Sequence, residues 1–269
     1  MLPRNNVLRL AAGAVLSVAS PTAVHAGAFP QAAGETQVIS SWFFSASSVA
    51  FNSDGLLART PPHRSHDVST LLEHGYDADT TLIFKPSFQR LDVTAPSGTT
   101  SRGLATTEAG VRRRLGILGD VTLSAQAFSR LIPDHNARLA APSRLQLEAG
   151  LAAGLPFSLF PGSLLSFTGF VDVSASLVKQ IGGTQDEVRA EATLGLQSSE
   201  RMLVLYQVFS VWSLQGAVPG GPYRRHKVQS SVVYMVTPQW RVQVGIFATV
   251  AGTTTRYERG VMSALWRRF

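Results

Sequence analysis

Charged side chains recur at alternate positions along several apolar stretches of the sequence, and this spacing suggests a shared role. Over residues 187–197, charged and polar residues alternate with Val188, Ala190, Ala192 and Leu194. A β-strand points successive side chains to opposite faces, so these charges would lie on one face. Charges of both signs on one face can pair with each other or select solutes by charge.

The same alternation extends to other stretches and gives a set of charged residues that we expect on one polar face. If that face lines a passage, its bias towards basic residues favours anionic or amphipathic solutes. The alternative is that opposite charges on neighbouring strands pair and brace the wall, and arginine suits both roles because its fork binds carboxylates bidentately. The set comprises Lys85, Glu108, Arg112, Arg114, Arg130, Glu148, Asp172, Arg189, Glu191, Lys227, Arg241 and Glu258. Further inward candidates are Glu73, Arg144, Glu187, Arg256 and Arg268.

Signatures of catalysis and of metal binding are weak. The chain contains no cysteine and no nucleophile-elbow, phosphate-loop or dinucleotide motif. His63 and His66 fall with Asp67 in a predicted loop, where two imidazoles and a carboxylate are more often solvated than bound to metal. A barrel enzyme acting on lipids would need a serine near a histidine such as His135 or His226. We expect no catalytic, cofactor or metal site.

The elements that must position these charges are strands. Periodicity of two predicts about twelve of them and no strong helix after residue 26. The ninth is apolar on both faces, which leaves its register open. The predicted strands lie near 35–46, 66–76, 80–91, 103–117, 120–131, 143–156, 164–180, 185–198, 202–214, 225–237, 239–251 and 255–269.

The links between the predicted strands are of two kinds. Short links, such as 77–79 and the Pro161-Gly162 turn, alternate with longer ones at 47–65, 92–102, 132–142 and 215–224, with a shorter exception at Gly182-Gly183. Alternating turns and loops are typical of outer-membrane barrels, and an even strand number would place both chain ends on the turn side. The sequence therefore predicts an all-β fold, a transmembrane antiparallel up-and-down β-barrel of about twelve strands.

Residues 1–26 have the features of a cleaved secretory signal peptide, with a basic start, a short apolar stretch and small residues at Val24 and Ala26. The remaining chain, residues 27–269, would form one domain exported to the cell outer membrane. Its net charge falls from +7 to +5, because the first 26 residues hold two arginines and no acid. The whole chain is 45% hydrophobic and only 15% charged, which excludes disorder and is unusual for a soluble domain.

The chain ends in Phe269, preceded at alternate positions by Leu265, Ser263 and Val261. This ending resembles the C-terminal signal by which the barrel-assembly machinery recognises outer-membrane barrels. Arg267 departs from the usual apolar residue two before the end, although its charge can reach the periplasmic interface. Arg113 also falls on an apolar face, so we expect it near a membrane interface.

Further segments resemble a family of small exported barrels encoded with meta-pathway phenol-degradation genes. They are the strand at 42–51, the Arg59-Thr60-Pro61-Pro62 segment, and residues 71–76 leading into 82–88. The resemblance implies a barrel that passes small solutes, with no catalytic residues. The rival functions are a lipid-modifying enzyme and a plugged barrel with a structural or surface role.

Expected partners follow from the basic residues near the external loops. Arg59 and Arg64, and Arg224, Arg225 and Lys227, form clusters that could contact lipopolysaccharide phosphates. Outer-membrane lipids, the barrel-assembly machinery and an unidentified small solute are the other expected partners. No nucleic-acid partner is expected, since the basic residues do not form a patch interleaved with aromatics.

Overall fold

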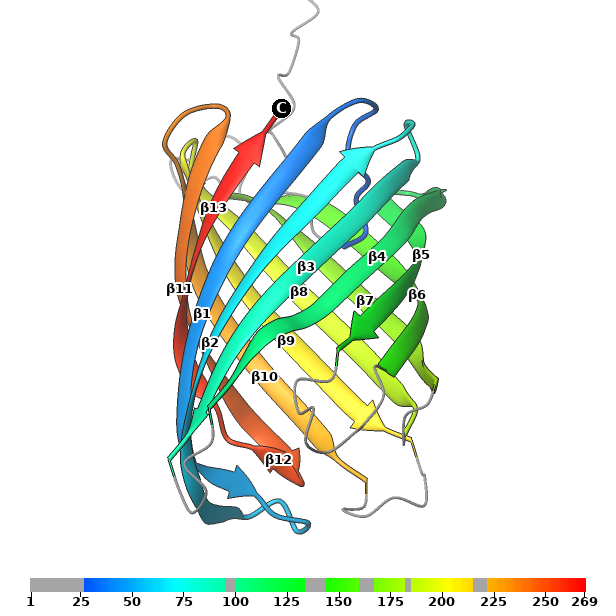
Figure 1. The fold of residues 1–269 in the computed structure, drawn as a ribbon. Coiled ribbons are helices and arrows are strands. Elements are labelled where there is room, and N and C mark those ends of the chain that lie inside the picture. Colours follow the sequence, from blue (N-terminus) through cyan, green and yellow to red (C-terminus); the bar gives the residue numbers. More distant parts are fainter. Residues whose placement is uncertain (1–26, 95–99, 134–143, 160–166, 182–184, 215–221) are drawn as a thin grey trace, which may run out of the picture.

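The structure, a computed structural model, is a closed barrel of twelve antiparallel strands, as predicted (Figure 1). It describes residues 27–94, 100–133, 144–159, 167–181, 185–214 and 222–269. The predicted signal peptide, the Pro161-Gly162 turn, the Gly182-Gly183 link and His135 lie outside these ranges. Among the described residues, no helix has the length and apolar character needed to cross a bilayer.

Each long strand pairs with its neighbours in sequence, and β1 pairs with both β2 and β13 to close the barrel. A further two-residue strand, β12, extends the edge of β1. The strands are β1 (Thr36–Phe51), β2 (Leu57–Gly75), β3 (Thr80–Val93), β4 (Thr100–Leu118), β5 (Val121–Ile132), β6 (Arg144–Leu159), β7 (Phe167–Ile181), β8 (Glu187–Ser199), β9 (Met202–Ser213), β10 (Arg224–Met235), β11 (Trp240–Thr253), β12 (Thr255–Arg256) and β13 (Arg259–Arg268).

Alternate residues of each strand face opposite sides of the wall, as the sequence pattern requires. On β11, Val242, Val244 and Ile246 are 40%, 60% and 64% exposed, whereas Gln243 between them is 5% exposed. The apolar set faces outward and the intervening set faces the lumen, which is the polarity of a membrane barrel. The register places Val244 opposite Val232 of β10, so the outward rows continue from strand to strand.

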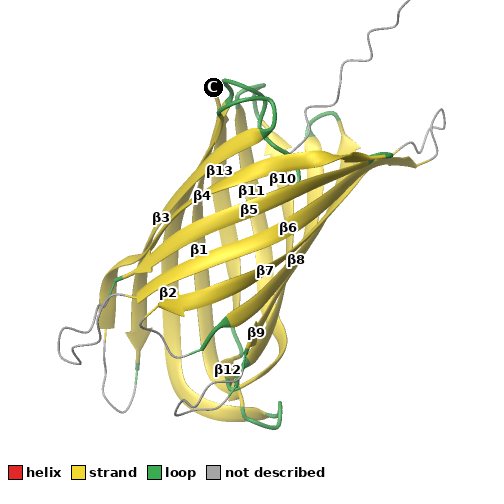
Figure 2. Cartoon of the chain, turned by 90° about the vertical axis from the view of Figure 1, so that its right-hand side faces the viewer, coloured by secondary structure: helices red, strands yellow, loops and turns green. Residues whose placement is uncertain are grey.

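Both ends of the described chain lie at the end of the barrel that carries the short turns (Figure 1). The backbone N–H of Phe269 donates to the carbonyl oxygen of Thr36 at 2.9 Å, so β1 begins where β13 ends. The turns at 76–79, 119–120, 200–201 and 236–239 share this end, here named the turn end. The opposite end, at the bottom of Figure 2, is here named the loop end; there β1 passes through residues 52–56 into β2.

The predicted first long loop, 47–65, is wrong. β1 and β2 continue through it as a paired ribbon and are joined by residues 52–56 alone. The pairing skips between Ser47 and Val49, where the register moves from His63 to Arg59 and leaves the proline pair in the irregularity. Prolines cannot donate to a ladder and are tolerated at such bulges. The period-two pattern is interrupted there, because residues 60–62 have no partner on β1.

Candidate functional site

One half of the lumen wall, from β2 to β8, carries a ladder of ion pairs. Arg130 of β5 contacts Glu108 of β4, and its Nη1 donates to Gln146 Oε1 of β6 at 2.9 Å. On β8, Arg189 donates through Nη2 to Glu187 Oε2 at 2.6 Å. All four of these charges were predicted to face inward, and the register brings them together in neighbouring rows.

Glu148 of β6 joins the two arginines. Its Oε2 lies 2.9 Å from Nη1 of Arg189 and 3.4 Å from Nη2 of Arg130, and its Oε1 accepts the Ser176 hydroxyl at 2.6 Å. The carboxylate side chain is only 10% exposed. Each charge in this group therefore has an opposite partner, which is the bracing arrangement.

A second pair lies lower in the wall, nearer the turn end. Nη1 of Arg112 on β4 lies 3.2 Å from Oε1 of Glu73 on β2, and both side chains are almost fully buried. Glu73 also accepts from Gln31 Nε2 at 3.0 Å. Glu73 was among the further inward candidates, and its contact with Arg112 agrees with that position.

Lys85 of β3 and Glu191 of β8 differ from the paired residues. Both are exposed to the lumen and line one cavity of about 210 Å³ together with Glu108, Arg112 and Arg130. No hydrogen bond or ion pair ties either side chain to another residue in the described part of the wall. Among the described residues that line this cavity, these two opposite charges lie outside the ion-pair ladder and act on each other electrostatically.

The other predicted charges lie near the ends of the barrel. Arg114 contacts Asp79 of a turn at 2.5 Å, and Arg241 is buried near the turn end of β11. At the loop end, Lys227 Nζ lies 3.2 Å from Glu258 Oε2. Burial alone would raise the pKa of Glu258, but the neighbouring Lys227 lowers it below its ordinary value.

The opposite half of the lumen wall is apolar. Its cluster comes from β9, β10, β11 and β13, with one residue of β7, and Ile39 and Phe43 of β1 pack against it. The indole of Trp266 donates to Gln243 Oε1 at 3.0 Å, which satisfies its polar atom. The buried members are Phe170, Leu203, Leu205, Val233, Phe247, Met262, Ala264 and Trp266.

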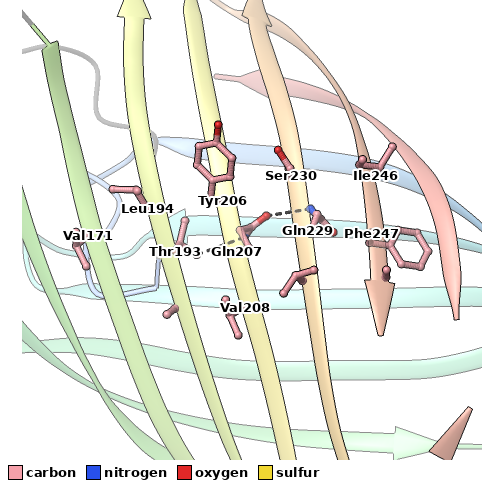
Figure 3. Close-up of a pocket in the computed structure, with 13 residues that line it drawn as sticks. Val171, Thr193, Leu194, Tyr206, Gln207, Val208, Gln229, Ser230, Ile246 and Phe247 are labelled. Carbon is pink, nitrogen blue, oxygen red and sulfur yellow. Dashed lines mark hydrogen bonds between the residues drawn. The ribbon is translucent and has the colours of Figure 1, made fainter. Parts of the chain in front are cut away.

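An uncharged hollow of about 500 Å³ indents the wall between β7 and β11. Its lining combines outward residues, such as Tyr206 and Ile246, with inward ones, such as Gln207 and Gln229. Figure 3 shows Gln207 and Gln229 on adjacent strands, joined by a hydrogen bond of 2.9 Å. The two amides bond to each other, and the residues that line the hollow carry no charge. The nearest described cation is Lys227, whose Nζ lies 4.9 Å from the centroid of the Phe247 ring.

The segment before β1 enters the lumen at the turn end, which sequence reasoning missed. Ala28 is fully buried; its N–H donates to Asp172 Oδ2 at 2.5 Å, and its carbonyl oxygen accepts from Ser124 Oγ at 2.6 Å. Phe29 packs edge-on against Phe170 at 6.3 Å between ring centroids. A Cβ at Gly154 would lie only 2.6 Å from the Phe29 ring, so a glycine makes room for it. Asp172, predicted to be a lumen charge, holds this segment.

The histidine group of the predicted first loop lies on β2 and cannot act together. His63 faces the lumen and is 2% exposed, whereas His66 faces outward and lies 4.9 Å from the Phe44 ring. Asp67 accepts from Ser65 Oγ at 2.8 Å and from Gln89 Nε2 at 2.6 Å, away from His66. The idea of a loop site built from these three residues is therefore wrong. No group of three candidate metal ligands occurs in the described ranges.

A serine and a histidine do meet at the loop end. Ser210 Oγ lies 2.9 Å from Nδ1 of His226, and the Trp212 ring packs edge-on against the imidazole. In the described part of the chain, no carboxylate hydrogen-bonds to His226. The pair has a nucleophile and a base but lacks the third group that orients a catalytic imidazole.

The end of the chain packs as a strand terminus. Arg267 lies over the rings of Trp240 and Phe269, at 5.0 and 4.2 Å from the centroids. The guanidinium thus covers two aromatic faces, a cation–π arrangement. Arg113 pairs in register with Thr80, the first residue of β3, which places it near the turn end as expected.

Comparison with known proteins shows the fold alone. No protein-family model and no curated protein sequence matches the chain. Among solved structures, the COG4313 outer membrane channel from Pseudomonas putida F1 has a TM-score of 0.70 and 13% identity, covering 92% of this chain and 100% of that one. LpxR from Salmonella typhimurium scores 0.51 at 9% identity, covering 86% and 99%. The NanC porin scores 0.50 at 6% identity, covering 84% and 98%.

Proposed function

We propose that the chain is an outer-membrane channel or facilitator for the passive passage of small amphipathic solutes. The observation that carries the proposal is the division of the lumen wall. Most charges of the β2–β8 half are paired within the wall, and the opposite half is mainly apolar. A solute with a polar and an apolar side can contact both halves without losing hydrogen bonds or exposing apolar surface.

The division also bears on the anionic solutes that the excess of basic residues favours. Arg112, Arg130 and Arg189 each contact a carboxylate, so their positive charge is largely cancelled within the wall. Amphipathic solutes are therefore better supported than anions. The resemblance of several segments to the barrels of phenol-degradation gene clusters favours amphipathic solutes, and the structural likeness to the outer membrane channel from Pseudomonas putida F1 supports the channel role alone.

The test compares two solutes of similar size in vesicles reconstituted with the full chain. One is an uncharged aryl glucoside, and the other is the corresponding aryl glucuronide, which is an anion. We expect the glucoside to enter severalfold faster, since the wall has no net cationic field to draw the anion. Faster entry of the glucuronide would contradict the choice of solute. No flux of either solute would favour a plugged barrel.

The rival enzyme function rests on the Ser210–His226 contact. If the pair acts on lipids, the wild-type protein should release fatty acid from phospholipid or lipopolysaccharide, and Ser210→Ala should abolish the release. Ser213→Ala is the matched control, because among the described residues the Ser213 hydroxyl bonds to the backbone of Tyr223 and to no histidine. Absence of hydrolysis by the wild-type protein would remove this rival.

A further inference from the structure

Two arginines on the outer surface near the loop end have no partner in the described structure. Arg64 of β2 and Arg259 of β13 are both exposed, and no ion pair or hydrogen bond within the described residues engages either. Both pair in register with Ala46 of β1, one from each side. A small residue thus separates two guanidinium groups that project from the same face of three adjacent strands.

The arginines line a hollow of about 580 Å³ that also includes Ser48, Thr94 and Tyr257. No carboxylate lines this hollow. The nearest acid in the register is Asp92 of β3, opposite Arg64, and other partners already occupy it. It lies 3.1 Å from Nε of Arg90 and accepts the Thr100 hydroxyl at 2.8 Å. The hollow therefore offers two free cations and neighbouring hydroxyls, a donor set suited to phosphate oxygens.

The height of the hollow on the wall identifies the source of the phosphate. Trp42 and Phe44 share the outer face of β1 with Ala46 and lie towards mid-barrel. With His66 they form an aromatic group whose ring centroids lie 4.9–6.4 Å apart. Aromatic girdles mark the membrane interface in barrels, and a strand rises about 3.4 Å per residue. The arginines therefore lie just beyond the girdle, at the level of lipid headgroups.

We propose that Arg64 and Arg259 form a binding site for the phosphates of lipopolysaccharide in the outer leaflet. The proposal rests on the outer-membrane placement given above, which puts the loop end outside the cell. It does not depend on which solute passes through the lumen, because both arginines face away from it. A bound phosphate would bridge β2 and β13 across β1, and so would clamp the seam where the barrel closes.

The test measures how lipopolysaccharide shifts the thermal unfolding midpoint of the purified full chain in detergent. The variant is Arg64→Gln with Arg259→Gln, and the matched control is Arg113→Gln, an exposed outward arginine near the turn end. We expect the wild type and the control to bind lipopolysaccharide alike and the double variant to bind at least tenfold more weakly. Dephosphorylated lipopolysaccharide should bind wild type as weakly as the double variant binds the intact lipid.

Three outcomes would overturn the proposal. They are unchanged binding in a correctly folded double variant, equal binding of the two lipid forms by wild type, and saturation of the site by inorganic phosphate that blocks the lipid. Heat-dependent migration on gels checks that the variants fold. A second variant, Arg64→Lys with Arg259→Lys, should retain part of the affinity. If the wild type showed no solute flux, the channel proposal would be contradicted, but the proposal of a phosphate site at Arg64 and Arg259 would be unaffected.

Discussion

The two halves of the lumen wall fill the inside of the barrel with different kinds of side chain. Each must fill space inside a barrel whose outer surface already faces lipid. The β2–β8 half does so with ion pairs that span neighbouring strands, such as Arg130 with Glu108. The opposite half uses packed side chains, such as Phe247 against Phe43 at 5.8 Å between ring centroids. Ion pairs need register and partners, whereas packing needs shape, so the two halves should fail differently.

The comparison also explains why the lumen is amphipathic without a strong net field. Paired charges keep their polarity towards water but cancel at a distance. The apolar half offers a solute mainly hydrocarbon, because its inward amides Gln207 and Gln229 are hydrogen-bonded to each other. It can therefore bury the apolar side of a solute. A lumen lined only by charged residues would hold water, and one lined only by apolar residues would pack into a dry core. In this barrel the two kinds of wall meet along a boundary inside the lumen.

The largest effect is expected in the apolar half, from Trp266→Ala. Removing a buried indole leaves a cavity and an unpaired Gln243 acceptor, and should lower the free energy of unfolding by about 4 kcal/mol. The measurement is urea unfolding in lipid vesicles followed by fluorescence. Leu265→Ala is the control, since Leu265 is 45% exposed on the outer face. Equal losses in both variants would show that the lumen cluster contributes no more than the lipid-facing surface.

A smaller loss is expected in the charged half, from Glu148→Ala. Arg130 and Arg189 each keep one other carboxylate, so the loss should be about 3 kcal/mol, at the lower end for a broken buried pair. Glu200→Gln, at an exposed turn, should have little effect in the same unfolding assay. If Glu148→Leu proves as stable as wild type, the ladder does not brace the wall, and the contrast between the halves would weaken.

The smallest effect on stability, and the clearest on flux, is expected from Asp172→Ala. Asp172 holds the N-terminal segment at the boundary of the two halves through the Ala28 N–H. Losing a hydrogen bond to a charged group costs about 2 kcal/mol, which raises the detached fraction of the segment by an order of magnitude or more. Single-channel conductance should rise accordingly, and Asp172→Asn, which keeps an acceptor, should restore it. Unchanged conductance in Asp172→Ala would show that the segment does not limit passage.

Sequence reasoning predicted the barrel well where strands cross the membrane. Over β11, successive residues face lipid and lumen in turn, so apolar and polar residues alternate. The outward positions of Val242, Val244 and Ile246 could therefore be predicted from the sequence. The same reasoning failed over residues 47–65, because a register shift within this ribbon interrupts the alternation. Its Pro61-Pro62 pair resembled a loop and is accommodated by a bulge.

The site was harder to predict than the fold. Alternation indicated which charges face inward, but not which pairs form, because pairing depends on register between strands. Glu148 meets Arg189 of β8 across β7, a contact that no spacing along the chain encodes. The position of the N-terminal segment inside the lumen could not be predicted, since small residues such as Ala28 show no periodic pattern. Ser210 and His226 were likewise joined only by register.

Closure by β1 and β13 has a kinetic consequence. Gln37 pairs with Arg268, so the seam joins residues from nearly opposite ends of the chain. Contacts of such long sequence separation form slowly, because the entropy of ordering the intervening chain is lost before they add stability. The seam should therefore be the last ladder to form. Because Ala28 is enclosed by β5 and β7, the segment that carries it must be inside before the seam closes, or thread in afterwards through the turn end.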